Sequence, residues 1–157
     1  AMVQLGSYLG SAFIIQSIVS GESEGWLLDI IGTVVFYLIS QLCFVIVGIF
    51  YQKITSYDIH KQIENDNIAA GVSFGLTLAA IGLLLSHIIS QSDSLVVFAI
   101  WFVNGLTLIM LTRFIIDRLL LPGHKLDDEI AQDQNWGVAI IEGGMAIVTA
   151  MLINASF

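Results

Sequence analysis

The sequence predicts an all-α integral membrane protein, with four transmembrane helices in two parallel hairpin repeats and a short helical segment at the amino terminus. Three observations predict this class: the composition, four long apolar blocks, and a motif that occurs twice. Of 157 residues, 57% are hydrophobic and 11% are charged, whereas soluble domains carry about a quarter charged residues. The mean hydropathy is +0.89. A soluble core of this size could not bury such blocks, so we expect the lipid bilayer to cover them.

Four apolar segments are long enough to cross a bilayer, which takes about 20 residues of helix. A fifth segment is shorter and is interrupted by serine and glutamine, so it is expected to span with help, to lie at the interface, or to form a partial helix. Backbone groups in lipid must pair within their own segment, which favours helices over strands. The four long segments are residues 26–51, 68–90, 95–121 and 136–153, and the shorter one is residues 5–20.

The charged residues orient these helices. The loops at residues 53–66 and 122–134 lie on one side, and all five basic residues fall in or near them, while the opposite side has only the acids Glu22, Glu24, Asp29 and Asp93. By the positive-inside rule the two longer loops are cytoplasmic and the carboxyl terminus lies outside. The expected location is a bacterial cytoplasmic (inner) membrane.

Two hairpins share the pattern Asn-x-small-x-small-x-x-x-Gly, beginning at Asn67 and at Asn135. The expected organisation is a partial helix and outer loop at residues 1–25, a first hairpin at 26–90 and a second at 91–157. Both copies point the same way, so they are parallel repeats. Residues 5–25 also resemble residues 75–95, which suggests half of a third hairpin from a longer tandem array.

Each shared position of the repeat has a structural explanation. Asparagine is a favoured helix N-cap, and the preceding acids place negative charge at positive helix ends. Small residues four apart let helices approach closely in lipid. A ligand-binding role for the caps is the alternative. The cap positions are Asp66, Asn67, Asp133 and Asn135, and the packing positions are Gly71, Gly75, Ala139 and Gly143.

The stretch Lys53-Ile54-Thr55, residues 63–75 and residues 130–143 resemble the bacterial inner-membrane family catalogued as domain of unknown function 350, the YjfL-like membrane proteins. The resemblance extends from about residue 26 to the end and implies a four-helix unit of two hairpins. It also implies partners, because members are often encoded near ATP-grasp ligases and near phage-shock or band-seven membrane-stress proteins. It transfers no active site.

Placing an ionisable side chain in the hydrocarbon of a membrane costs free energy, so such residues mark functional sites. Glu142 follows Asn135 by seven residues, and Arg113 precedes residue 121 by eight, so both lie at similar depth below the same membrane surface. We expect them to face each other, with Asp117 and Arg118 completing a network. The alternatives are a packing ion pair, which is favoured, and a gate or ion site.

A second polar set comprises Ser40 and Gln41 in the first long segment and Asn104 and Thr107 in the third. Interhelical hydrogen bonds between these segments could satisfy all four side chains. In an oligomer, these residues and Glu142 could instead line a polar pathway.

Several function classes are excluded or disfavoured. The net charge of −8 argues against nucleic acid. The histidines lie far apart, Cys43 is alone, and neither a nucleophile motif nor a phosphate-binding loop is present, so no enzyme, cofactor or metal site is expected. The acidic run Asp127-Asp128-Glu129 is interpreted as a solvated loop.

Two hypotheses remain for the function. The favoured one is a homo-oligomeric channel or transporter for an ion or small cation. Polar side chains within the membrane are costly, and a scaffold has less need of them than a transport protein. The alternative is a membrane scaffold whose cytoplasmic loops recruit cytoplasmic or peripheral envelope-stress partners. Small-residue faces presented twice per chain favour homo-oligomerisation in either case.

Overall fold

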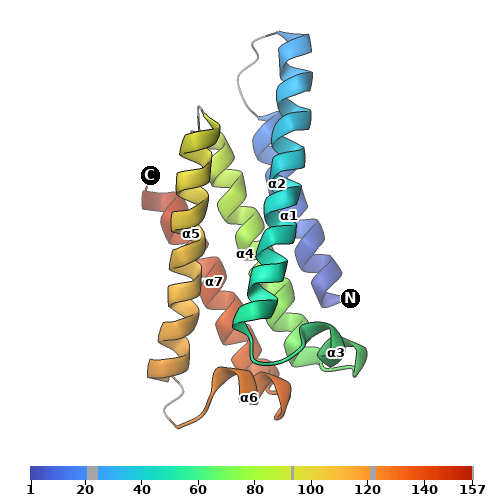
Figure 1. Cartoon of the computed structure of the whole chain (residues 1–157), viewed down its shortest axis with the longest axis vertical. Helices are drawn as coiled ribbons and strands as arrows, with labels where there is room; N and C mark the ends of the chain where they lie inside the picture. The colour runs from blue at the N-terminus through green and yellow to red at the C-terminus, as the bar shows by residue number, and fades with distance from the viewer. Residues whose placement is uncertain (21–24, 93, 121–122, 157) are drawn as a thin grey trace.

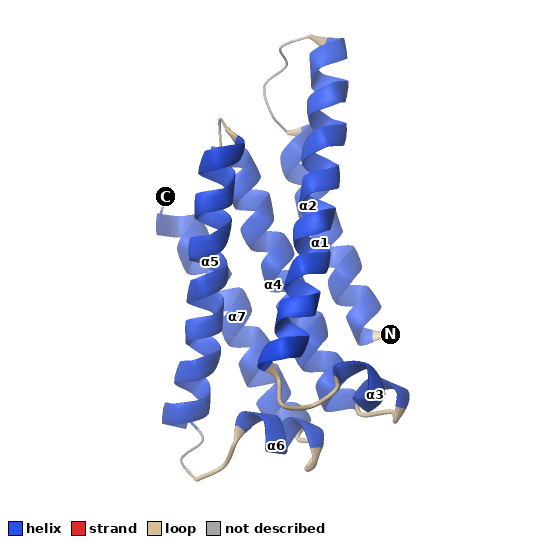
Figure 2. Cartoon of the chain, in the orientation of Figure 1, coloured by secondary structure: helices blue, strands red, loops and turns tan. Residues whose placement is uncertain are grey.

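A computed structural model describes residues 1–20, 25–92, 94–120 and 123–156, without the side chains at 28, 29 and 120 (Figure 1). Glu22, Glu24 and Asp93, and the side chain of Asp29, thus lie outside the described residues. The described part contains helices, turns and loops but no strand (Figure 2). The helices are α1 (Met2–Val19), α2 (Trp26–Ile54), α3 (Ile59–Glu64), α4 (Ile68–Gln91), α5 (Leu95–Ile115), η1 (Ile116–Leu120), α6 (Leu126–Ala131) and α7 (Trp136–Ser156).

Five of the described helices, rather than four, are long and apolar enough to cross a membrane. The added one is α1, which the sequence predicted only as a short or partial segment. Two of its polar residues, Ser11 and Ser17, have hydrogen-bond partners in other helices, which lowers the cost of placing them in a membrane-length helix. The Ser17 hydroxyl donates to the Ser86 carbonyl at 2.6 Å, and the Gln41 amide donates to the Ser11 hydroxyl at 3.4 Å.

Helix α4 is the centre of the bundle, with α1, α2, α5 and α7 around it (Figure 1). Most of its side chains are buried, whereas α2 and α5 expose most of theirs. The exposed residues of the outer helices are largely Leu, Ile, Val and Phe. In water such a surface would be unfavourable, but lipid is as apolar as these side chains. The pattern is that of a bundle whose rim faces a bilayer.

Glycines bring α1 against α4. A Cβ atom added at Gly6 would overlap the Gly75 backbone, and one added at Gly82 would overlap the Gly10 backbone. The helices therefore touch through their main chains at two levels. In lipid, where no hydrophobic effect drives helices together, such close approach supplies the van der Waals contact that holds them.

A short polar helix follows the second span and another follows the fourth, and both lie at one end of the bundle, here called the α3–α6 end (Figure 1). After each, the chain turns through one non-glycine residue with positive φ, Asp66 at 59° and Gln134 at 50°. The next residue caps the following helix: the Asn67 side chain accepts from Ala70 N at 3.1 Å, and that of Asn135 from Val138 N at 3.2 Å. The tandem hairpin repeat itself stays a prediction.

The fourth span departs from the single helix expected over residues 95–121. Helix α5 ends at Ile115 and continues as the π-helical segment η1 (Ile116–Leu120). A π turn adds a residue to the helical repeat, so side chains beyond it point in different directions from those of a continuous α-helix.

We predict that Gly82→Ala lowers the thermal stability of the protein in detergent, because the new methyl group would collide with the main chain of Gly10. Gly144→Ala is the matched control, since a Cβ there meets nothing within 4 Å and alanine gains up to about 1 kcal/mol of helix propensity over glycine. Thermal unfolding followed by size-exclusion chromatography measures both. Equal melting temperatures for Gly82→Ala and the wild type would contradict the α1–α4 packing.

Candidate functional site: a buried carboxylate cluster

Glu142 lies on α7, within the bundle of membrane-length helices, and its side chain is 3% exposed. Its Oε1 accepts hydrogen bonds from the Tyr51 hydroxyl at 2.7 Å and from Arg113 Nε at 2.6 Å. Its Oε2 accepts from the Ser73 hydroxyl, which also contacts the Tyr51 hydroxyl at 2.8 Å. The carboxylate is thus held by α2, α4 and α5 together.

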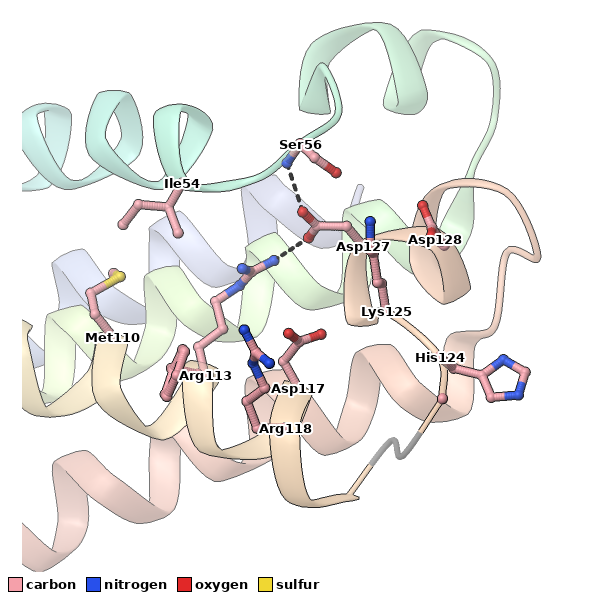
Figure 3. A pocket seen from close by; sticks show the side chains of 12 residues that line it. Ile54, Ser56, Met110, Arg113, Asp117, Arg118, His124, Lys125, Asp127 and Asp128 are labelled. Carbon is pink, nitrogen blue, oxygen red and sulfur yellow. Dashed lines mark hydrogen bonds and ion pairs between the residues drawn. The ribbon is translucent and has the colours of Figure 1, made fainter.

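Arg113 connects this buried carboxylate to the α3–α6 end. Its Nη2 donates to Asp127 Oδ1 of α6 at 2.5 Å, while Asp127 Oδ2 accepts from the Ser56 backbone N–H at 2.7 Å (Figure 3). The guanidinium also lies 5.6 Å from the centre of the Tyr51 ring, a cation–π distance. The Arg113 side chain therefore connects the interior of the bundle to the α3–α6 end.

The charges of the cluster do not balance. Two carboxylates share one guanidinium, which leaves a formal charge of −1 when both acids are ionised. Burial by itself would raise the pKa of Asp127, but the charge and hydrogen bonds of Arg113 and the Ser56 N–H outweigh it and hold that pKa below its ordinary value. Burial first, and then the negative charge of Glu142, raise the pKa of Tyr57, whose hydroxyl has no hydrogen-bond partner among the described residues.

A cavity of about 10 Å³ lies beside Glu142, which is roughly the room of one water molecule. The hydroxyl-bearing residues Tyr51, Thr77 and Thr112 help to line it. A larger pocket of about 720 Å³ opens at the α3–α6 end (Figure 3). Arg113 and Met110 line both spaces, so these two side chains form the wall between them.

The expected network of Asp117 and Arg118 with Glu142 and Arg113 is wrong. Asp117 Oδ1 instead accepts from the Leu126 backbone N–H at 2.8 Å, and the Arg118 guanidinium lies 5.6 Å from the centre of the Phe114 ring. Both residues belong to the π-helical segment η1 and lie beside Arg113 in the wide pocket, but the described residues make no bond from either of them to Arg113 or Glu142 (Figure 3). Asp127 takes the place that they were expected to fill.

The expected hydrogen bonds between the second and fourth spans are also absent from the described residues, because α2 packs mainly against α1 and α4, whereas α5 packs mainly against α7 and α4. Gln41 bonds to Ser11 of α1, and the buried Ser40 hydroxyl has no partner in the part of the chain that the structure describes. Asn104 and Thr107 are exposed on the outer face of α5 and donate to carbonyls of their own helix, at 3.1 and 2.7 Å.

Three residues of the site, Tyr51, Ser73 and Asp127, were not predicted from the sequence. Tyr51 and Ser73 are ordinary in apolar helices, and only their depth, close to that of Glu142, could have suggested them. Asp127 was interpreted as part of a solvated loop because an acidic run has that appearance in most proteins.

The small residues of the predicted repeat lie at the interfaces of α4. Ala139 is fully buried, and a Cβ at Gly143 would overlap the Leu76 side chain. Gly75 approaches the Met2 backbone, and a Cβ at Gly71 would make ordinary contact with Met2.

The acidic residues of the predicted repeat, Asp66 and Asp133, are exposed beside the asparagine caps. Within the described chain, no group of three or more His, Cys, Asp or Glu residues could hold a metal ion.

A bundle of membrane-length helices around a buried, hydrogen-bonded ion pair defines a polytopic α-helical membrane protein. Residues 25–157 match the model of the family described as Domain of Unknown Function (DUF350), so the chain belongs to that family, as the sequence motifs indicated. A similar protein is the UPF0719 transmembrane protein YshE of Bacillus subtilis (strain 168), 28% identical over 133 residues, which cover 85% of this chain and 98% of the relative. No solved structure shows significant similarity to the chain.

We predict that Arg113→Gln lowers the free energy of unfolding by about 3–5 kcal/mol, the usual cost of leaving a buried charge without its partner. The double variant Arg113→Gln, Glu142→Gln should recover part of this loss, because it removes both charges. Chemical or thermal denaturation in one detergent measures the series.

Arg118→Gln is the control for this stability series, since it removes the same charge five residues later from a side chain that has no carboxylate partner among the described residues. A loss for Arg118→Gln as large as that for Arg113→Gln would show that the loss reflects charge near the helix end rather than the buried pair.

Proposed function

We propose that this protein is a non-enzymatic membrane transport protein for a proton or a small monovalent cation, with Glu142 as its binding carboxylate. The observation that carries the proposal is the uncompensated negative charge of the Glu142–Arg113–Asp127 cluster inside a membrane-length bundle. A charge at that depth is costly, and binding a single positive charge would neutralise it.

The size of the site supports a small substrate. The cavity beside Glu142 has room for roughly one water molecule, and the oxygen ligands that line it are hydroxyls and a carboxylate, next to the Arg113 guanidinium. Carboxylates and hydroxyls are hard oxygen ligands that suit protons and alkali cations. A hydrated divalent ion or an organic cation would not fit without rearrangement.

Arg113 is the proposed gate. It separates the cavity from the wide pocket at the α3–α6 end, and it holds both acids at once. A cation that bound Glu142 would weaken the attraction between that carboxylate and Arg113. The guanidinium could then leave Glu142 while it keeps its bond to Asp127, which would open the wall on that side. On the opposite side of Glu142, the buried apolar side chains Ile81, Leu84, Leu85 and Ile88 close the bundle, so the geometry corresponds to an occluded state.

We further propose that the α3–α6 end faces the cytoplasm of a bacterium and that the carboxyl terminus lies outside. The five basic residues of the chain are in or near α3, η1 and α6, and cytoplasmic loops carry such an excess.

We also propose that the protein is a homo-oligomer that associates through α5. Asn104 lies near the middle of this span, is exposed, and donates to the Ile100 carbonyl, while no bond to its Oδ1 is made by the described residues. In hydrocarbon, an exposed amide gains by pairing with a polar group on another helix, and a second copy supplies an identical amide.

Flux through liposomes tests the transport proposal. Purified protein in vesicles with a pH-sensitive or cation-sensitive dye should dissipate an imposed proton, Na⁺ or K⁺ gradient faster than empty vesicles do. We predict that Glu142→Gln reduces this rate at least about tenfold, because the amide keeps the shape but cannot hold a positive charge, and one lost charge interaction of about 1.4 kcal/mol gives this factor.

Glu64→Gln is the matched control for flux, since it also removes one carboxylate, from an exposed position on α3. Its rate should equal that of the wild type. No flux above empty vesicles for the wild type, or equal flux for Glu142→Gln, would overturn the proposal.

A scaffold is the second candidate, favoured by the way the polar end is held together. The Ser56 N–H to Asp127 bond and the 2.9 Å bond from Asn67 Nδ2 to the Ile130 carbonyl join the two polar segments into one surface. Such a surface could recruit soluble or peripheral partners, among them the membrane-stress proteins and ATP-grasp ligases that the family resemblance implies. Loss of partner capture on reversing exposed α3 charges, with unchanged flux, would favour this function.

We predict that Asn104→Leu weakens association between copies by about 1 kcal/mol, the usual value of one interhelical hydrogen bond in membranes. Energy transfer between labelled copies in vesicles, measured over a range of protein-to-lipid ratios, reports this change. Met151→Leu, at an exposed position of α7, is the control and should leave association unchanged. Identical association curves for Asn104→Leu and the wild type would contradict an α5 interface.

A further inference from the structure

The wide pocket at the α3–α6 end has one apolar side and one charged side. Ile54, Met110 and Phe114 form the apolar side, and Ile54 and Phe114 are 39% and 57% exposed at the ends of two membrane-length helices. The charged side chains Asp117, Arg118, Lys125 and Asp128 lie toward the other end (Figure 3). This change from apolar to charged occurs where a bilayer changes from acyl chains to headgroups.

The charges that remain available in this pocket sum to zero. Among the residues that line the pocket, Arg113 is paired with Asp127, and His124 lies 3.1 Å from Glu129. Two cations, Arg118 and Lys125, then face two carboxylates, Asp117 and Asp128, without a direct ion pair among the described residues. A net-neutral pocket that presents both signs of charge suits a zwitterionic ligand better than an anion.

The Arg118 side chain is held ready for such a ligand. Its guanidinium lies against the Phe114 ring at 5.6 Å, an arrangement that restricts the long side chain before binding. Guanidinium groups match phosphate oxygens with paired hydrogen bonds. The carboxylates of Asp117 and Asp128 each accept one hydrogen bond within the protein, from the Leu126 N–H and the Gln132 amide, and each has lone pairs left for another donor.

We propose that this pocket binds the headgroup of a zwitterionic phospholipid that carries a primary ammonium group, the phosphatidylethanolamine class. Arg118 and Lys125 hold the phosphate, Asp128 and Asp117 accept hydrogen bonds from the ammonium, and the first part of an acyl chain lies along Phe114, Met110 and Ile54. The ammonium donates hydrogen bonds that a choline headgroup cannot donate. A purely anionic headgroup would leave both carboxylates facing negative charge. This inference does not depend on the proposed transport.

Lipid retention by the full chain tests the proposal. The protein is placed in nanodiscs of equal parts phosphatidylethanolamine, phosphatidylglycerol and phosphatidylcholine, extracted gently, and weighed with its bound lipids by native mass spectrometry. We expect one phosphatidylethanolamine per chain to be retained about tenfold more often than either other lipid. Equal retention of the three lipids, or preference for phosphatidylglycerol, would overturn the proposal.

Variants assign the retained lipid to this pocket. Arg118→Gln should lower phosphatidylethanolamine retention about tenfold, the equivalent of about 1.4 kcal/mol for one charge-assisted contact. Asp128→Asn should reduce the preference for ethanolamine over choline, while Lys61→Gln, an exposed lysine on α3 outside the pocket, should change nothing. Unchanged retention in Arg118→Gln would place the lipid elsewhere and overturn the assignment.

Soluble phosphoethanolamine separates recognition of the headgroup alone from recognition of the whole lipid. At millimolar concentration it should displace little of the retained lipid, because it lacks the acyl chain that contacts Phe114 and Met110. Complete displacement would show that the pocket takes the free phosphate compound rather than a membrane lipid, against the proposal. Flux is not read in these assays, so their failure leaves the transport proposal untouched, and the reverse also holds.

Discussion

The sharing of one guanidinium between two carboxylates is the interaction on which the polar architecture of this protein depends. Arg113 on α5 holds Glu142 on α7 and Asp127 on α6, while Tyr51 on α2 and Ser73 on α4 complete the hydrogen bonds of Glu142. Four membrane-length helices and one short helix therefore meet at this cluster of Arg113, Glu142 and Asp127. A carboxylate buried in lipid without such partners would cost several kcal/mol, so the cluster also constrains how these helices pack.

The second constraint is the close approach of helices to α4. Glycines on α1, α5 and α7 each face this central helix, and at Gly10, Gly105 and Gly143 a methyl group would overlap an α4 atom or approach it too closely. Small residues let the main chains come together in an environment that supplies no hydrophobic driving force. The close packing excludes lipid from the centre of the bundle, where the carboxylate cluster would otherwise meet hydrocarbon.

Both proposed sites use the same end of the molecule, and Arg113 belongs to the boundary between them. On one side it closes the small cavity beside Glu142, and on the other it lines the wide pocket that contains Arg118 and Lys125. A headgroup in the wide pocket would therefore lie next to the wall of the carboxylate site. Occupation of one site could alter the electrostatic field at the other, because the two share this guanidinium.

The sequence by itself determined the class of protein, the four long spans to within a few residues at most ends, the two asparagine caps, and the matching depth of Glu142 and Arg113. Each follows from local rules: the length of apolar helix that lipid requires, the preference of helix N-termini for asparagine, and the rise per residue. Only the tertiary structure decided that α1 is a full membrane-length helix against α4, that Asp127 rather than Asp117 or Arg118 joins the cluster, and that Asn104 and Thr107 face outward. These outcomes depend on which helix occupies the centre of the bundle and on which side chain reaches Arg113. Both are contacts between separate segments of the chain, which periodicity and spacing do not encode.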